Sequence, residues 1–239
     1  MNIVSTADLR RTYGEGETAV HALAGVTLDF PAGQYTAIMG PSGSGKSTLM
    51  HLLAGLDRPT SGTVEIEGED LSKLDDTGLT RLRRDRLGFV FQAFNLVPVL
   101  TALENITLPI TLAGRKPDQA WLDELIETVG LRDRLTHRPS ELSGGQQQRV
   151  AVARALASRP DIMFGDEPTG NLDSRAGAEV LGFLRNSVRE LGQTVVMVTH
   201  DPVAAAVASR LVVLDDGKVV HDGEGKDAAG VLDLMKAVA

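Results

Sequence analysis

The chain has 239 residues, of which 42% are hydrophobic, so it can bury a substantial core as one large domain or as a domain carrying an inserted subdomain. Its formal net charge of −8 at pH 7 excludes a general attraction to nucleic acid or to an anionic membrane surface, which leaves only local sites for phosphate. The absence of cysteine excludes disulfide bonds and metal sites built on thiolates.

The N-terminal segment, "MNIVSTADLRRTYGEG", lacks the charged stretch and the long apolar stretch of a targeting signal. No apolar run in the sequence approaches the roughly 18 residues of a membrane-spanning helix. We therefore expect a cytosolic protein.

Short β-like runs alternate with helical patterns along the chain, which predicts an α/β fold with parallel strands. In residues 26–30 and 62–68 apolar and polar residues alternate, which indicates half-exposed strands of an antiparallel edge sheet. Residues 35–39, 161–164 and 194–199 are more continuously apolar, as expected for parallel strands covered on both faces. Near the C-terminus, "RLVVLDDGKVVHDG" predicts a hairpin that turns at Asp215-Asp216-Gly217.

Between these strands the character of the sequence changes. Residues 93–159 contain the helical pattern "AWLDELIETVGL" and a second helix after Ser143. We expect this segment to be a mostly helical subdomain inserted into a core formed by residues 1–92 and 160–239. Because the sequence shows no long linker, the insertion should pack onto that core as part of a single domain.

The segment "GPSGSGKST" (residues 40–48) matches the phosphate-loop pattern G-x-x-x-x-G-K-[ST]. It follows the expected strand 35–39 and opens a helix on which Leu49, Leu52, Leu53 and Leu56 fall on one face. The alternative, a Gly/Ser-rich turn with an incidental lysine, does not explain why pattern and context agree. The candidate nucleotide-binding residues here are Gly40, Pro41, Ser42, Gly43, Ser44, Gly45, Lys46, Ser47 and Thr48.

The chemistry of this loop follows from its composition. Glycines let the backbone turn its N–H groups toward phosphate oxygens, and the helix N-terminus adds the positive end of a dipole. Lys46 would neutralise the β- and γ-phosphates, and the hydroxyl of Ser47 would bind Mg²⁺.

Two adjacent carboxylates, Asp166 and Glu167, follow the expected buried strand 161–164. Ligands of open parallel sheets bind at the carboxyl ends of the strands, so this pair should converge with the phosphate loop on one site. Asp166 would hold Mg²⁺ through water, and Glu167 would accept a proton from, or orient, an attacking water. The alternative is an acidic turn before Pro168.

His200 and Gln92 also stand at the ends of expected strands. A histidine at that place could donate to the γ-phosphate and help to hold the water, although a lone histidine before Asp-Pro is often only a turn residue. An amide at a strand end is usually solvated, so Gln92 is a candidate only because it occurs together with the other motifs.

The segment "ELSGGQQQRVAVARAL" places two glycines at the start of an otherwise good helix. Ser143 as N-cap and Gln146 three residues later form a capping box. This does not explain Gly144 and Gly145, since a glycine in a helix costs about 1 kcal/mol relative to alanine. Bare N–H groups at a helix N-terminus suit an approaching anion. Because the phosphate loop already holds a nucleotide, we expect this segment to close over the nucleotide of another copy.

The order of these motifs resembles that of the ATP-binding-cassette (ABC) ATPases. The resemblance rests on Tyr13, "GPSGSGKST", Gln92, "LSGGQ" (residues 142–146), "IMFGDE" (residues 162–167), "NLD" (residues 171–173) and "VTHD" (residues 198–201). It implies a phosphate-loop NTPase (RecA-like) core with an antiparallel β edge subdomain and an inserted helical subdomain. It also implies a head-to-tail homodimer in which two ATP molecules, with Mg²⁺, lie between the phosphate loop of one chain and the Ser143–Gln146 segment of the other.

The same resemblance assigns further roles. Tyr13 would stack on adenine, Gln92 would link Mg²⁺ and the water to a membrane partner, Asp173 would lie in a loop that crosses the dimer interface, and His200 would be the switch histidine. The catalytic set implied is Glu167, His200, Lys46 and Gln92. The metal set is Ser47, Gln92 and Asp166.

More closely, the sequence resembles the subgroup that energises lipoprotein release, macrolide export and related peptide-resistance and cell-division complexes. It implies an ATPase bound to integral membrane permease subunits on the inner face of the cell membrane. The apolar segment after Gln92, with Phe94, Leu96 and Val97, would line a groove for a short cytoplasmic helix of that partner. The alternative is that these residues only pack the insertion against the core.

Two other classes explain the sequence less well. DNA-repair and chromosome-organising ATPases of this family carry long coiled-coil or zinc-bearing insertions, whereas this chain has one compact insertion, no cysteine and no basic stripe, so no nucleic-acid partner is expected. A GTPase or small-molecule kinase would leave "LSGGQ" unexplained. An ATPase that regulates cell division through a membrane partner, without transport, stays open.

Overall fold

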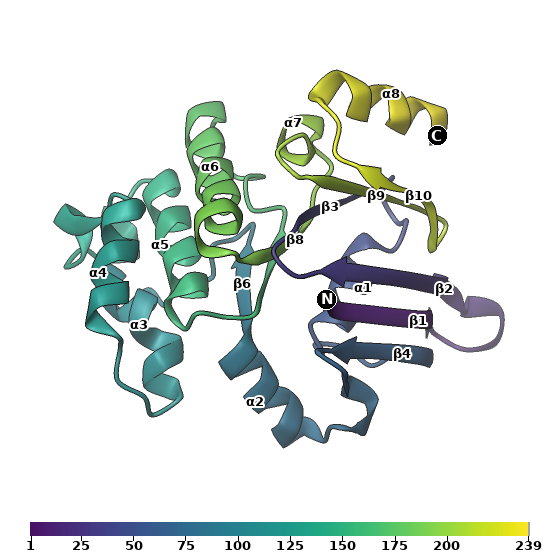
Figure 1. The fold of residues 1–239 in the computed structure, drawn as a ribbon, viewed down its shortest axis with the longest axis horizontal. Coiled ribbons are helices and arrows are strands. Elements are labelled where there is room, and N and C mark those ends of the chain that lie inside the picture. The colour runs from purple at the N-terminus through teal and green to yellow at the C-terminus, as the bar shows by residue number, and fades with distance from the viewer. Residues whose placement is uncertain (239) are drawn as a thin grey trace.

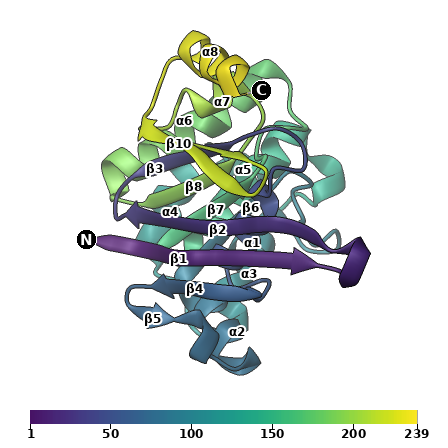
Figure 2. The same ribbon diagram turned by 90° about the vertical axis from the view of Figure 1, so that its right-hand side faces the viewer.

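A computed structural model describes residues 1–238 and confirms the predicted α/β fold, with two β-sheets and helices on both sides of the larger one (Figure 1). The smaller sheet is antiparallel, with strand order β2-β1-β4-β5, and Figure 2 shows its strands side by side. Its strands are β1 (Asn2–Tyr13), β2 (Val20–Pro31), β4 (Ser61–Ile66) and β5 (Glu69–Asp70). The two strands expected from alternation lie in β2 and β4, on either side of β1, which sequence analysis did not assign.

The larger sheet has strand order β10-β9-β3-β8-β7-β6 and is parallel except for β10. Its strands are β3 (Tyr35–Met39), β6 (Leu87–Phe91), β7 (Ile162–Asp166), β8 (Thr194–Val198), β9 (Arg210–Asp215) and β10 (Lys218–Glu224). Every residue of β3 and β8 is buried, as the continuous apolar runs predict. The expected hairpin joins β9 to β10 through Asp216 and Gly217, which both have a positive φ (44° and 71°), as a tight hairpin turn requires.

All eight α-helices of residues 1–238 begin within or after the phosphate-loop segment in the sequence. They are α1 (Lys46–Leu53), α2 (Asp76–Arg86), α3 (Ala102–Leu112), α4 (Gln119–Thr128), α5 (Gly144–Ala157), α6 (Ser174–Leu191), α7 (Pro202–Ala205) and α8 (Ala228–Val238). Short 3₁₀ turns occupy Gly16–Thr18, Leu71–Lys73, Arg132–Arg134 and Pro139–Glu141. Among residues 1–238, none of these helices has the length and apolar character needed to cross a membrane.

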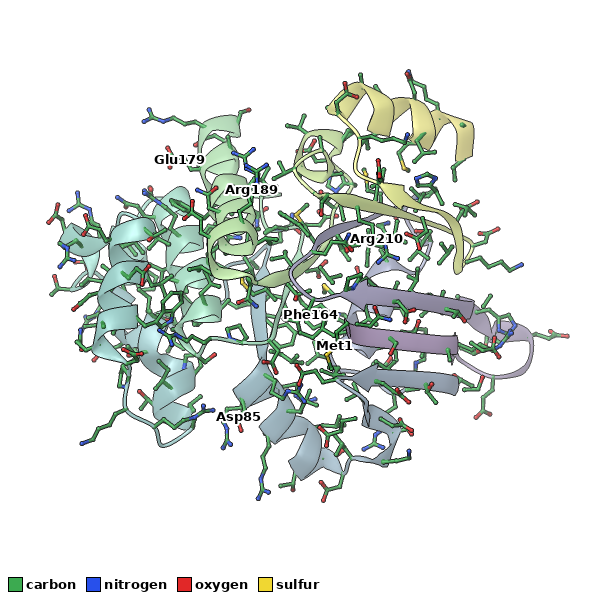
Figure 3. The ribbon with its side chains drawn as sticks, in the orientation of Figure 1. Met1, Asp85, Phe164, Glu179, Arg189 and Arg210 are labelled. Carbon is green, nitrogen blue, oxygen red and sulfur yellow. The ribbon has the colours of Figure 1, made fainter. Side chains whose placement is uncertain are left out.

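The core lies on both faces of the parallel sheet, because successive side chains of a strand point to opposite faces. Ile38, Phe164 and Val196 pack with α1 and the antiparallel sheet, whereas the preceding residue of each strand faces the other side with α3, α4, α5 and α6. Helix α1 contacts strands of both sheets. Phe164 is fully buried and stacks on Phe89, with 5.9 Å between ring centroids, and Figure 3 shows it near the centre of the molecule.

The helix after the phosphate loop is shorter than the spacing of its leucines predicts. Leu49, Leu52 and Leu53 are buried on α1, but the helix ends at Leu53 and Leu56 lies beyond it, 45% exposed. Gly55, with a φ of 61°, turns the chain away directly after the helix. The helical spacing therefore continues in the sequence for one more turn than the helix itself does.

Residues 93–159 contain α3, α4, α5 and two short turns, so the segment is mostly helical. In Figure 1 its helices gather at one side of the molecule. Helix α5 packs against strand β6 and contributes Val150, Val152 and Ala153 to the same hydrophobic cluster as the sheet. The insertion thus packs onto the core, and the exact division at residues 92/93 and 159/160 stays a prediction.

Candidate functional site

The phosphate-loop segment joins the end of β3 to the start of α1 and is shaped by glycines that no other residue could replace without strain. Gly40 and Gly45 have positive φ values of 149° and 98°. A Cβ built on Gly40 would lie 2.1 Å from the carbonyl oxygen of Leu214, and one on Gly45 would lie 2.3 Å from that of Ala22. Strands β9 and β2 therefore press on the loop from outside and hold its curvature.

One charged group within this loop, the ammonium of Lys46, fits a phosphate ligand. Lys46 Nζ donates hydrogen bonds to the carbonyl oxygens of Gly40 (2.9 Å) and Pro41 (2.7 Å), so its ammonium lies inside the curve of the loop. Burial lowers the pKa of Lys46, although the carboxylates of Glu167 and Asp166 oppose this shift. The hydroxyl of Ser44 is buried and has no hydrogen-bond partner among residues 1–238. The ammonium of Lys46 can pair with a phosphate oxygen, whereas the Ser44 hydroxyl is not accessible to a ligand.

The acidic pair lies at the carboxyl end of β7, with Asp166 as the last residue of the strand. Burial raises the pKa of Asp166, as does Glu167, while His51 of α1 and Lys46 lower it. Both carboxylates therefore lie close enough to raise the pKa of Lys46, and Lys46 lies close enough to lower that of Asp166. Sequence analysis missed His51, because its approach to Asp166 depends on how α1 packs under the strand.

Glu167 has an unusual backbone conformation. Its φ is 47°, in the left-handed region that non-glycine residues rarely adopt. Its N–H donates to the carbonyl oxygen of Val198 (2.9 Å), which ties the turn to the end of β8. Its Oε1 lies 2.8 Å from Nδ1 of His200, so the structure brings these two candidate residues into direct contact.

Gln92 follows β6 and is joined to the loop after Glu167. Its Nε2 donates to Asn171 Oδ1 (3.3 Å), and Asn171 Nδ2 donates back to the carbonyl oxygen of Gln92 (3.0 Å). Gly170 makes room for this pair, because a Cβ there would lie 2.7 Å from Gln92 Nε2. Asn171 belongs to the "NLD" motif, but no pattern in the sequence predicts its pairing with Gln92.

The capping box at the start of α5 is confirmed. Gln146 N donates to Ser143 Oγ (3.3 Å), and Ser143 N donates to Gln146 Oε1 (2.9 Å). The two glycines differ, however. A Cβ on Gly145 would lie 2.9 Å from Cβ of Ala176 on α6, whereas the nearest atoms to one on Gly144 are 3.8 Å away. Gly145 thus has a packing reason within the chain, which sequence analysis missed, and only Gly144 is left without one.

Gly144 lies in a hollow of about 430 Å³ between the start of α5 and the start of α6. The hollow is lined by Ser143, Gly144, Gly145, Arg149, Asn171, Leu172, Asp173, Arg175, Ala176 and Glu179. Asp173 caps α6 by accepting hydrogen bonds from the N–H groups of Arg175 (3.0 Å) and Ala176 (2.9 Å). No residue of the phosphate loop lines this hollow, so Ser143 and Asp173 gather at a surface of their own.

Tyr13 ends β1 and is 40% exposed. Its hydroxyl donates to Asp57 Oδ2 (2.8 Å), and the guanidinium carbon of Arg11 lies 4.5 Å from the centre of its ring. Arg11 Nε also donates to Asp57 Oδ2 (2.9 Å). The ring is therefore fixed by two neighbours, with one face covered by Arg11.

Comparisons with known proteins agree with this architecture. Residues 23–170 match the family described as "ABC transporter". The Macrolide export ATP-binding/permease protein MacB of Marinobacter nauticus is 48% identical over 222 residues, which cover 92% of this chain but only 34% of that protein. This chain therefore spans about a third of the length of its MacB relatives. An uncharacterised ABC transporter ATP-binding protein of Thermotoga maritima is also 48% identical, over 96% of this chain and 97% of that one.

Among solved structures, the ATP-binding cassette MJ0796, described as a dimer in a post-hydrolysis state bound to ADP and Pi, has a TM-score of 0.83 and 43% sequence identity. The match covers 93% of this chain and 99% of that one. The family match, the relatives and the shared fold lead to one conclusion: the chain belongs to the ABC transporter family and is an ATPase of the ATP-binding-cassette type.

Proposed function

We propose that two copies of this chain close head to tail around two Mg-ATP molecules and that the cycle of binding and hydrolysis drives a membrane permease. The observation that carries this proposal is the separation of two complementary surfaces on one chain. One surface holds the phosphate loop with Asp166, Glu167 and His200, and the other holds Ser143 and Gly144 beside Asp173. Each is half of a site, and a two-fold axis would pair each half with its complement.

Within the first half-site, Lys46 and the N–H groups of the loop would bind the β- and γ-phosphates, and Tyr13 would stack its open face on adenine. Glu167 would orient or deprotonate the attacking water. Because Nδ1 of His200 bonds to Glu167, Nε2 is the atom that can reach the γ-phosphate.

The donor set suits Mg²⁺. Among residues 1–238, no group of three or more His, Asp or Glu side chains converges on a metal position. Mg²⁺ is commonly held by one or two protein oxygens together with substrate phosphates, and Ser47, Asp166 and Gln92 offer hydroxyl, carboxylate and amide oxygens for this. When bound, it neutralises charge on the β- and γ-phosphate oxygens.

Complementation between two inactive variants tests the head-to-tail arrangement. Lys46→Ala disables the phosphate loop. Gly144→Glu should fold, because its Cβ has room and an acidic residue suits the first turn of a helix, but its carboxylate would repel phosphate. A heterodimer of the two has one composite site with both halves intact. Mixing them should restore ATP hydrolysis to at most roughly a quarter of the wild-type rate.

The matched control mixes Lys46→Ala with Glu167→Gln. Both changes fall in the same half-site, so neither site of the heterodimer is complete and hydrolysis should stay absent. Restoration in the control, or none in the Lys46→Ala and Gly144→Glu mixture despite normal folding, would contradict the head-to-tail site.

The proposed membrane contact differs from the one expected from sequence. Leu96 packs against the core, and the ring of Phe94 lies near Gly144. Neither residue lines the hollow that lies next to the segment after Gln92. This hollow, of about 260 Å³, opens between α2, β6, α3 and α5. It is lined by Arg83, Arg84, Leu87, Gly88, Phe89, Phe91, Asn95, Pro109, Arg154, Ala155 and Ser158.

This hollow is lined by apolar side chains of β6 and by three arginines from α2 and α5. Asp85, on the side of α2 that faces α3 in Figure 3, pairs with both Arg84 and Arg115. Arg83 and Arg154 have no carboxylate partner among residues 1–238, and Arg154 donates to the carbonyl oxygen of Phe94 (2.9 Å). Such a groove fits a short helix with an apolar face and acidic ends. We place the chain at the cytoplasmic face of a membrane on this basis, by analogy with the permease named in its MacB relatives.

Charge reversal tests this contact. Arg83→Glu should abolish co-purification of an integral membrane protein with the tagged chain, while ATP-driven dimerisation is unchanged. Arg81→Glu is the matched control, because Arg81 lies on the same helix, is exposed and does not line the hollow. Equal recovery of the membrane protein with both variants would rule this groove out.

A further inference from the structure

Gln148 is a fully buried glutamine on α5, near the Ser143–Gln146 segment. Its Nε2 donates hydrogen bonds to two backbone carbonyl oxygens, that of Phe91 (3.4 Å) and that of Pro168. Its Oε1 has no hydrogen-bond partner among residues 1–238. A buried acceptor left unpaired lowers stability, so this amide is poorly explained as a device for stability alone.

The two carbonyls occupy significant places. Phe91 is the last residue of β6 and directly precedes Gln92, and Pro168 directly follows Glu167. One amide group therefore holds the backbone beside both residues. Phe91 and Pro168 lie on segments that are far apart in the sequence, and Gln148 joins them from a third segment.

The turn at Glu167 needs such support, because a residue in the left-handed region keeps its conformation only when its surroundings fix it. Val198 accepts a hydrogen bond from the N–H of Glu167, and the carbonyl of Glu167 accepts one from Gly170 N (3.0 Å). The Gln148 amide fixes the next carbonyl along the chain. Without the Gln148 amide, the turn that carries the Glu167 carboxylate keeps only two of these three hydrogen bonds.

We propose that Gln148 is a positioning residue for ATP hydrolysis, which holds Glu167 and Gln92 in register with α5. The proposal rests on the proposed roles of Glu167 and Gln92. Helix α5 begins with the segment that would face the partner's nucleotide. If α5 moves when the dimer closes, Gln148 moves with it and displaces the turn at Glu167 of the same chain. Gln148 does not touch the substrate and acts through these neighbours.

Gln148→Met tests the proposal, because methionine has a similar length and volume and no donor. Gln193→Met is the matched control. Gln193 is also buried, and its Nε2 donates to the carbonyl oxygen of Pro160 (2.8 Å), at the opposite ends of the parallel strands. We expect Gln148→Met to lower kcat by about ten- to a hundredfold. The KM for ATP should stay within about threefold. The control should keep both constants while losing an equivalent hydrogen bond.

Equal kcat values for the two variants, or a loss of ATP binding that parallels the loss of kcat in Gln148→Met, would overturn the proposal. If the methionine variant does not fold, Gln148→Asn replaces it, since its amide is one methylene too short to reach both carbonyls and the same split is expected. Glu167→Gln is measured alongside. If that variant hydrolyses ATP normally, the proposed function fails; if it is inactive while Gln148→Met resembles wild type, only the positioning role fails.

Discussion

The two glycines at the start of α5 can be tested separately: substitution of Gly145 tests packing, and substitution of Gly144 tests ligand recognition. Gly144→Ala and Gly145→Ala are the same chemical change one residue apart. A Cβ at Gly144 meets its nearest atoms at 3.8 Å, an ordinary contact distance, and one at Gly145 meets Ala176 Cβ at 2.9 Å. Because Ala176 Cβ is fixed to the backbone of α6, only a relative shift of the two helices can relieve that contact.

The magnitudes follow from these distances. Alanine in place of glycine stabilises a helix by up to about 1 kcal/mol, so Gly144→Ala should unfold at an equal or higher temperature than the parent. At Gly145 the same gain is opposed by overpacking, which costs about 1–3 kcal/mol. The net loss of up to about 2 kcal/mol corresponds to a fall in Tm of up to about 8 °C for a chain of this size.

The methyl group of Gly144→Ala would stand between the bare N–H groups and an approaching phosphate, so this variant should dimerise less readily. In a Glu167→Gln background, light scattering across an ATP titration measures dimer formation, and calorimetry measures Tm. Gly144→Ala should require at least about tenfold more ATP to dimerise while its Tm is unchanged or raised. Dimerisation of Gly144→Ala at the parent's ATP concentration would show that an anion does not approach Gly144. A Tm for Gly145→Ala as high as that of Gly144→Ala would refute the packing argument.

Three further predictions follow from the site. Gly170→Ala should displace the side chain of Gln92, whose Nε2 would lie 2.7 Å from the new Cβ, and lower kcat by about tenfold with little change in Tm, as steady-state kinetics and calorimetry would show. Burial raises the pKa of Asp166 above its ordinary value of 3.8, so its ionised form destabilises the fold at neutral pH. Asp166→Asn should therefore abolish hydrolysis yet raise Tm by a few degrees at pH 7, and this gain should shrink as the pH falls toward 4; a gain that grows on acidification would contradict the assigned cause. Tyr13→Phe loses only the hydrogen bond to Asp57 and should keep most of its ATP affinity, whereas Tyr13→Ala should lose about 1–3 kcal/mol by titration of a fluorescent ATP analogue. Equal affinities for the two variants would show that adenine does not stack on this ring.

Much of the fold could be predicted because it depends on residues that are adjacent in the sequence. The buried strands at residues 35–39 and 194–199 and the hairpin turn at Asp216 and Gly217 depend on local hydrophobic patterns and on the backbone freedom of the turn residues. The capping box of Ser143 and Gln146 is equally local. The candidate site could be predicted for the same reason, since strand ends of a parallel sheet meet at one edge whatever the helices do.

The sequence pattern failed at Leu56 for a local reason and at Gly145 because of a contact between distant segments. The helical spacing extends to Leu56, but Gly55 turns the chain away from the core. Ala176 explains Gly145, which sequence analysis attributed to ligand binding alone.

By itself, the sequence determined the family, the phosphate loop, the acidic pair and the order of the motifs, because each depends on residue type and short spacing. Only the tertiary structure decided which side chains support them. His51 lies close enough to Asp166 to lower its pKa. Asn171 pairs with Gln92, and Gln148 donates to the carbonyl oxygen of Pro168, across segments that no spacing rule connects. Such contacts depend on how close-packed helices and strands meet in space, and a linear pattern carries no record of that distance.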